Sequence, residues 1–275
     1  MEPNQYNNND QNIYYDQPQQ NYQQPQNYQQ PQQQYYQQQY YQPGNPYQAV
    51  GQAASEVRDL LQNEVIAKSF LYMVAALAVT AIAAFTAPDL LAGWLMKGRY
   101  NFIILFAAEL AIVIASNVAM TKNNVAVSAI LFTVYSYLTG ATLGIIFWAY
   151  DLASVGAIFL MTAAMFGIMA VYGLVTRKDL SSVGNICMMG IIGIIIASLV
   201  NILFIRNGVF DLIVSVIGVA IFVGLTAYDV QKIKKRVYYA TDENVACLAL
   251  WGAFGLYLDF INLFLRLLRL FGKRK

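Results

Sequence analysis

The stretch "LASVGAIFLMTAAMFGIMAVYGLVT", residues 152–176, contains no charged side chain. A helix of about 20 apolar residues spans the roughly 30 Å hydrocarbon core of a bilayer, so this run is long enough to cross it. Uncharged runs of similar length occupy residues 69–88, 123–150 and 180–205. Charged residues make up only 12% of the 275-residue chain, against about a quarter in a soluble domain. The sequence therefore predicts a multi-pass helical membrane protein.

The hydropathy pattern predicts an all-α membrane protein with seven transmembrane helices, at about residues 69–88, 101–121, 125–149, 152–175, 183–205, 209–237 and 244–271. This domain, residues 69–275, follows a low-complexity tail (1–50) and a charged amphipathic helix (51–68) that we expect at the membrane surface, with Ser55 as its N-cap. Because the connections are short, we expect no separate catalytic domain and no enzymatic activity.

The first 48 residues hold 18 Gln and 10 Tyr but no Lys or Arg, and "NYQQPQ" occurs twice in succession. Such a segment has too few aliphatic side chains to offset the entropy lost on ordering, so we expect a disordered tail. Two roles stay open for it. It is either a solvated, dispensable tail or a segment that binds membrane-protein partners.

Composition excludes several classes of function. There is no histidine, which removes the commonest zinc ligand and any Ser-His or Cys-His nucleophile pair. A net charge of +2 is too small to indicate a nucleic-acid partner. Cys187 and Cys247 lie in or beside apolar runs and are expected to be buried small side chains. We expect no cofactor.

The distribution of basic residues predicts the orientation in the membrane. With the five cations of the C-terminal end set aside, nine Lys and Arg lie on the side of the N-terminus and three on the other. This bias predicts a cytoplasmic N-terminus. A re-entrant last span, which would leave the basic C-terminus inside, stays open. Short loops favour a bacterial plasma membrane over a eukaryotic endomembrane.

Three acids fall within the predicted spans, namely Glu109, Asp229 and Asp259. An ionisable residue in a membrane span is a functional candidate by default, because burying its charge is costly. Glu109 could instead pair with Arg266 or Arg269 of the last helix as a structural latch. Asp229 lies near a basic helix end, where Lys232 could satisfy it.

Asp259 has no charged neighbour for two helical turns, and only Asn262 and Arg266 share its face. We therefore predict that the last helix is central, with this polar stripe toward an internal cavity. If the last two helices turn near Asp242, Asp229 and Asp259 differ in level by four residues, or about 6 Å. The two carboxyls could then meet.

Two carboxylates in a poorly hydrated site cannot both ionise cheaply, so such a pair shares a proton and can sense pH without histidine. Protonated, the pair can link the two helices through a hydrogen bond. Doubly ionised, it attracts a cation, and its oxygen ligands suit Ca²⁺. Two carboxylates are too few for tight binding, so we expect transient calcium at Asp229 and Asp259.

Two motifs carry a family resemblance. "GLTAYDVQKIK" (Gly224–Lys234) and "LYLDFINLFLRLLR" (Leu256–Arg269) resemble the signature of the Bax inhibitor-1 family, the transmembrane Bax-inhibitor-motif proteins. "TRKDLSSVG" (Thr176–Gly184) and "AELAIVIAS" (Ala108–Ser116) are similar to other family segments. The resemblance covers about residues 65–272.

The resemblance implies seven helices, six around the last, and a pH-sensitive calcium leak controlled by an aspartate pair. The pair maps onto Asp229 and Asp259, and the family's acid on the second helix maps onto Glu109, with Arg269 as its basic partner. Bacterial relatives can carry an arginine at the inner end of the second helix that reaches the pair. Here that segment offers only Lys122.

Several functions stay open at this level. A proton-gated cation leak through the bilayer, with calcium ions and protons as its partners, fits the predicted aspartate pair. A regulator of other membrane proteins, such as proteases or cell-death factors, fits the tail. A proton-coupled cation exchanger would also use a shared proton. An intramembrane aspartyl protease is disfavoured, because Asp259 lies in "YLDF" without the expected glycine context.

Overall fold

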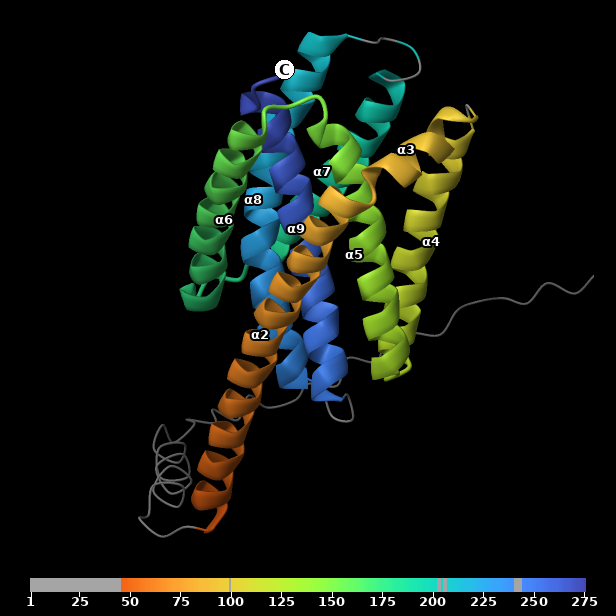
Figure 1. Cartoon of the computed structure of the whole chain (residues 1–275). Helices are drawn as coiled ribbons and strands as arrows, with labels where there is room; N and C mark the ends of the chain where they lie inside the picture. Colours follow the sequence, from red (N-terminus) through yellow and green to blue (C-terminus); the bar gives the residue numbers. More distant parts are fainter. Residues whose placement is uncertain (1–45, 99, 202–203, 205–206, 240–243) are drawn as a thin grey trace, which may run out of the picture. The chain divides into compact units, whose positions relative to one another are not determined.

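The structure is a computed structural model that describes residues 46–98, 100–201, 204, 207–239 and 244–275 (Figure 1). The predictions for the tail up to residue 45, and for the turn at 240–243, lie outside these residues. The chain divides into two units, Met1–Ala53 and Ala54–Lys275. Every contact described below lies within the second unit.

The described part of the chain is helical almost throughout. Its helices are α2 (Pro46–Thr86), α3 (Pro88–Met96), α4 (Asn101–Thr121), α5 (Val125–Phe147), α6 (Leu152–Val175), α7 (Ser181–Val200), α8 (Gly208–Tyr239) and α9 (Val245–Phe271). All of them except α3 are long and apolar enough to cross a membrane, which gives seven candidate spans in the described residues and confirms the predicted fold class.

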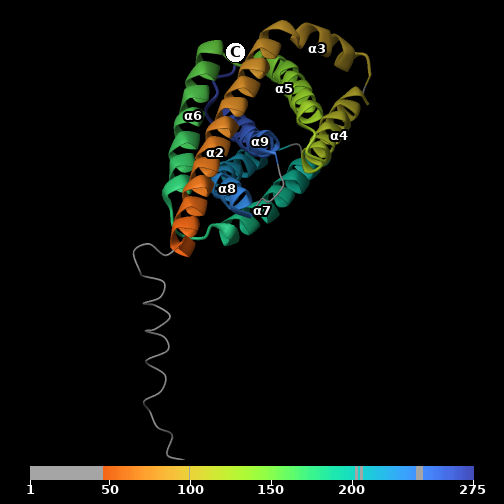
Figure 2. The same cartoon turned by 90° about the horizontal axis from the view of Figure 1, so that it is seen from below.

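The last helix is the most enclosed. In the most apolar 18-residue stretch of α9, 72% of the residues are buried within the protein. The corresponding share in the other six spans lies between 17% and 39%. Viewed along the helices, α9 lies among the other long helices (Figure 2). The prediction of a central last helix is thus confirmed, and the other spans turn much of their surface outward to lipid.

Most helix boundaries agree with the sequence-based expectation, and side-chain caps explain several of them. The side chain of Asn124 caps α5 by accepting a hydrogen bond from Val127 N (3.1 Å). Asp151 caps α6 in the same way, and Asn244 caps α9. The expected N-cap at Ser55 is wrong, because α2 is one continuous helix from Pro46 and Ser55 lies inside it.

Glycines bring helices into backbone contact at several places. A Cβ atom on Gly140 of α5 would lie 2.3 Å from the carbonyl oxygen of Thr80 in α2, and one on Gly144 would lie 2.3 Å from that of Ala84. This GxxxG pair therefore lets the backbones of α2 and α5 pack closely together. A Cβ atom on Gly173 of α6 would likewise overlap the Ala227 carbonyl oxygen of α8.

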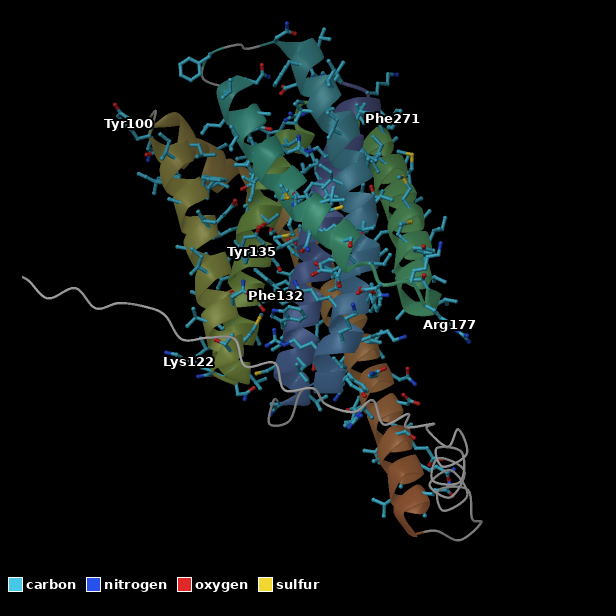
Figure 3. All side chains as sticks on the ribbon, turned by 180° about the vertical axis from the view of Figure 1, so that it is seen from behind. Tyr100, Lys122, Phe132, Tyr135, Arg177 and Phe271 are labelled. Atoms are coloured by element: carbon cyan, nitrogen blue, oxygen red, sulfur yellow. The ribbon has the colours of Figure 1, made fainter. Side chains whose placement is uncertain are left out.

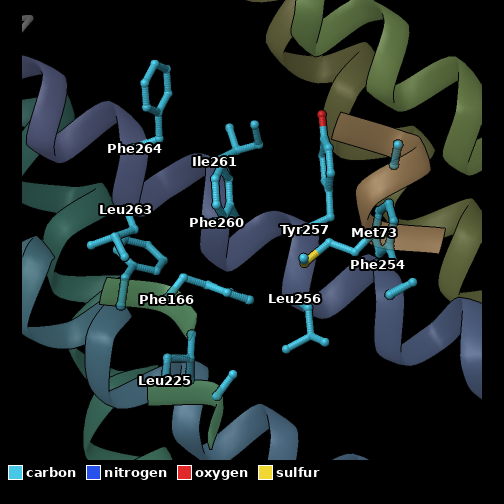
Figure 4. Close-up of a cluster of buried hydrophobic side chains, with 14 of the residues drawn as sticks. Met73, Phe166, Leu225, Phe254, Leu256, Tyr257, Phe260, Ile261, Leu263 and Phe264 are labelled. Carbon is cyan, nitrogen blue, oxygen red and sulfur yellow. The ribbon is translucent and has the colours of Figure 1, made fainter. Parts of the chain in front are cut away.

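Aromatic side chains of α9 fill the space between it and the surrounding helices (Figure 4). Phe254 and Tyr257 contact Phe132 of α5 edge to face, with ring centroids 5.1 and 5.4 Å apart. Phe260 contacts Phe166 of α6 in the same manner at 5.5 Å. These rings bury large apolar areas on one side of α9, which leaves its polar residues on another side.

The connection between α6 and α7 is held to α8 by side chains. The amide of Gln231 accepts a hydrogen bond from Leu180 N (2.9 Å) and donates one to the Lys178 carbonyl (2.8 Å). Lys235 forms a salt bridge with Asp179 (2.5 Å). Arg177 of this loop lies at the same end of the bundle as Lys122, opposite Tyr100 and Phe271 (Figure 3). The loop therefore ties α8 to α6 and α7 at that end.

We expect Gly140→Ala to lower the stability of the purified protein in detergent. The added methyl group would overlap the α2 backbone, and overpacking of this kind costs about 1–3 kcal/mol. Gly167→Ala is the matched control, because nothing lies within 4 Å of a Cβ there. Thermal unfolding followed by circular dichroism measures both variants. An unchanged melting temperature for Gly140→Ala, equal to that of the control, would contradict the close α2–α5 contact.

Asp179→Asn tests the loop as a function of pH. Hydrogen bonds from Lys235 and from the hydroxyl and amide of Ser181 hold the pKa of Asp179 well below its ordinary value. A lowered pKa in the folded state stabilises the protein above the unfolded pKa of about 4, and this stabilisation is lost as the pH falls through the folded pKa. The wild type should thus melt above the variant at pH 7, with a difference that shrinks below about pH 4.

The exposed Asp59 supplies the control for that experiment, because Asp59→Asn removes a carboxylate from α2 rather than from the loop. A difference between wild type and Asp179→Asn that stays constant from pH 7 to pH 3 would show that the ionised carboxylate does not hold the loop.

Candidate functional site

A cavity of about 410 Å³ lies against the central helix α9. We call it the central cavity. Residues of α4, α7, α8 and α9 line it, and most of them are aliphatic or aromatic. Its polar lining residues are Asn117, Asp229, Lys232, Asp259, Asn262 and Arg266. The cavity therefore collects the intramembrane charges of α8 and α9, and it borders the polar stripe that the sequence predicts on the last helix.

Both predicted aspartates line this cavity, from neighbouring helices. The Oδ2 atom of Asp229 lies 3.3 Å from where a Cβ on Gly255 would stand, so the α8 side chain reaches the α9 backbone one turn before Asp259. Asp259 is also close enough for the charge of Asp229 to act on it. Both carboxyls thus line one cavity, from neighbouring helices and about one helical turn apart along α9, as the helix count allows.

Asp259 is the more deeply placed of the two. Its side chain is 3% exposed, and its Oδ2 atom has no hydrogen-bond partner among the residues that the structure describes. An unpaired buried carboxyl oxygen is costly to maintain unless water, a proton or a cation satisfies it. The Oδ2 atom of Asp259 is therefore a position where water, a proton or a cation can bind.

Lys232 belongs to the same cavity, although the sequence analysis considers it only as a partner for Asp229. Its amine stands over the rings of Tyr228 (5.5 Å) and Trp251 (5.1 Å), and its charge acts on both aspartates. The signal in the sequence is its position three residues after Asp229, which places both on one helix face. Lys232 thus supplies a positive charge to the cavity from α8, on the C-terminal side of Asp229.

The other predicted site residues divide between the cavity and elsewhere. Asn262 and Arg266 line the central cavity, and the Asn262 amide donates to the Leu258 carbonyl (2.8 Å). Lys122 follows the last turn of α4 as an exposed residue and does not line the cavity. From α4, Asn117 lines the cavity instead; it is a polar residue in an apolar helix and is not among the predicted site residues.

The predicted latch between Glu109 and an arginine of the last helix is wrong. Glu109 accepts a hydrogen bond from Thr142 of α5 (3.3 Å), while Arg269 pairs with Asp211 of α8 (3.4 Å). Depth explains the difference. At about 1.5 Å per residue, Glu109 lies about 12 Å inside α4, whereas Asp211 and Arg269 both lie within about 5 Å of their helix ends.

The described residues contain no group of three or more potential metal ligands of the His, Cys, Asp and Glu types. The pair of carboxyls can thus offer a cation a few oxygen ligands but not a full protein coordination sphere. Both cysteines are buried, and neither forms a disulfide within the described part of the chain.

Comparison with known proteins supports the resemblance. Residues 62–275 match the family model described as "Inhibitor of apoptosis-promoting Bax1". The inner membrane protein YbhL of Escherichia coli (strain K12) is 42% identical over 215 residues, covering 76% of this chain and 92% of the relative. An uncharacterised protein of Rickettsia prowazekii (strain Madrid E) is 39% identical over 211 residues, or 76% and 89% of the two chains.

A further uncharacterised relative, from Borreliella burgdorferi, is 38% identical over 220 residues, which cover 78% of this chain and 94% of the relative. The region that the family model matches, residues 62–275, takes in all the helices that line the central cavity and excludes the Gln- and Tyr-rich tail. With the family model matching most of its length, this chain is a multi-pass integral membrane protein that belongs to the Bax inhibitor-1 family.

Proposed function

We propose that this protein is a pH-sensitive cation leak, with Ca²⁺ as its permeant ion and the Asp229–Asp259 pair as its gate. The observation that supports the proposal is that two carboxyls from neighbouring helices line one cavity of a membrane domain, one of them buried with an unpaired oxygen. A bacterial plasma membrane with a cytoplasmic N-terminus is the setting that the relatives and the charge distribution favour.

The chemistry of the pair provides the gate. With one shared proton, the two carboxyls lose their mutual repulsion and can hydrogen-bond, which holds α8 and α9 together. When that proton is lost, the two carboxylates repel each other and attract a cation. Their hard oxygen ligands favour Ca²⁺ over transition metals. Because the site offers few ligands, a bound ion can also leave, as conduction requires.

The central experiment measures Ca²⁺ flux into proteoliposomes of the full-length protein between pH 5 and 8. We expect a flux with a pH midpoint for the wild type. Asp229→Asn and Asp259→Asn should each lose or shift that dependence, because an amide neither gains nor loses a proton in this range. Asp89→Asn, an exposed carboxylate of α3, is the matched control and should behave as the wild type does.

A flux that stays at the level of empty liposomes at every pH would contradict the leak. A regulator that acts by binding other membrane proteins would then be the better proposal, and deletion of residues 1–50 would test the tail in that role. Proton movement in a fixed ratio to Ca²⁺ movement would indicate an exchanger instead of a passive leak.

A further inference from the structure

A second polar cavity, of about 350 Å³, adjoins the central cavity on the side of the C-terminal end of α9. We call it the end cavity. Its polar lining residues are Tyr150, Ser198, Asp211, Asn262, Arg266 and Arg269. Asn262 and Arg266 line both cavities, so these two side chains form the partition between them.

A third cavity continues the series to the surface. It has a volume of about 480 Å³, and Asp211 and Arg269 line both it and the end cavity. Its other lining residues include Asn207 before α8 and Arg274 near the C-terminus. In Figure 1 the start of α8 and the end of α9 lie at the same end of the bundle. The three cavities thus mark a route from the aspartate pair to that end.

Arg266 places a positive charge on this route, at the boundary between the central cavity and the end cavity. It lies two helical turns after Asp259, and its guanidinium makes no hydrogen bond or salt bridge with any residue that the structure describes. Arg269, one turn further on, is instead paired with Asp211. The charge of Asp211 acts on Arg266 as well, but its salt bridge is with Arg269. An arginine in a membrane span without a salt bridge of its own is costly and marks a functional position by default.

The neighbouring helix leaves room for this side chain. A Cβ atom on Gly218 of α8 would lie 3.0 Å from Cδ and 3.1 Å from Nε of Arg266. The glycine therefore lets the arginine lie along α8 at the boundary of the two cavities. The positive charge is held there by packing of its stem rather than by an ion pair.

We infer that Arg266 is a fixed electrostatic barrier between the aspartate pair and the C-terminal end of the bundle, which limits the flux of cations along this route. The inference rests on the proposed cation leak. A permeating cation must pass the guanidinium, and Coulomb repulsion scales with the charge of the ion. The barrier therefore repels Ca²⁺ more strongly than K⁺. It keeps the Ca²⁺ flux slow, as expected of a leak.

Removing the charge tests the barrier directly. In proteoliposomes at one pH within the conducting range, Arg266→Gln should raise Ca²⁺ flux by roughly tenfold and K⁺ flux by a smaller factor. Arg266→Lys keeps the charge and should stay near the wild-type flux. Lys273→Gln, which removes a positive charge from an exposed residue that lines none of the three cavities, is the matched control.

A charge-specific rescue separates the barrier from a packing defect. Arg266→Cys should conduct like Arg266→Gln, and labelling with a cationic methanethiosulfonate should return the flux toward the wild-type level. An anionic methanethiosulfonate of similar size should not. Wild-type protein treated with both reagents is the control, since Cys187 and Cys247 are buried. This comparison stays valid if Arg266→Gln folds poorly, because both measurements use one variant.

The results distinguish failure of the barrier from failure of the leak. Unchanged or lower flux in Arg266→Gln, or equal effects of the two reagents, would overturn the barrier while the aspartate variants still lose their pH dependence. If wild type and every variant stay at the level of empty liposomes, both proposals fall. If Arg266→Gln raises Ca²⁺ flux and K⁺ flux by the same factor, the electrostatic barrier is also overturned, because simple widening of the path would produce that result.

Discussion

The burial of the Asp259 carboxyl within the membrane is the constraint on which the rest of the structure depends. A helix that carries Asp259, Asn262 and Arg266 along one stripe cannot present that stripe to lipid at a reasonable cost. Surrounding it with six other helices solves this, because their apolar outer faces meet the hydrocarbon while α9 is enclosed. The central position of α9 is thus a consequence of its own polar residues.

Enclosing one helix with six others requires close contact between backbones, and the small residues provide it. Gly140 and Gly173 stand where any Cβ would meet a neighbouring carbonyl oxygen. In the membrane, such contacts replace the hydrophobic effect as the source of helix association. The same rule shapes the site. Gly255 gives the Asp229 side chain access to α9, and Gly218 gives Arg266 access to α8.

Properties that depend on position along a single helix could be read from the sequence. The apolar runs predict the ends of most spans to within a few residues, although α2 begins at Pro46, well before the predicted span at 69–88. The count along α8 and α9 predicts that Asp229 and Asp259 lie at similar depth, and both line the central cavity. The nine residues of α3 are too few for a span, so this helix falls in what the hydropathy pattern predicts as a connection. Partners that depend on which helices are neighbours could not be read, and Glu109 shows this because its partner is Thr142.

Charged side chains along α8 and α9 are paired at one end of the bundle and lack such partners toward its middle. At the C-terminal end of α9, Arg269 and Asp211 neutralise each other. Toward the middle, Arg266 and Asp259 line the central cavity without a described hydrogen-bond partner at the guanidinium or at Oδ2. Water and mobile ions are the remaining species that can satisfy them in a membrane interior. The fold thus pairs the charges at its end, while at its centre Asp259 Oδ2 and the Arg266 guanidinium have no hydrogen-bond partner among the described residues, which is the arrangement that the proposed leak requires.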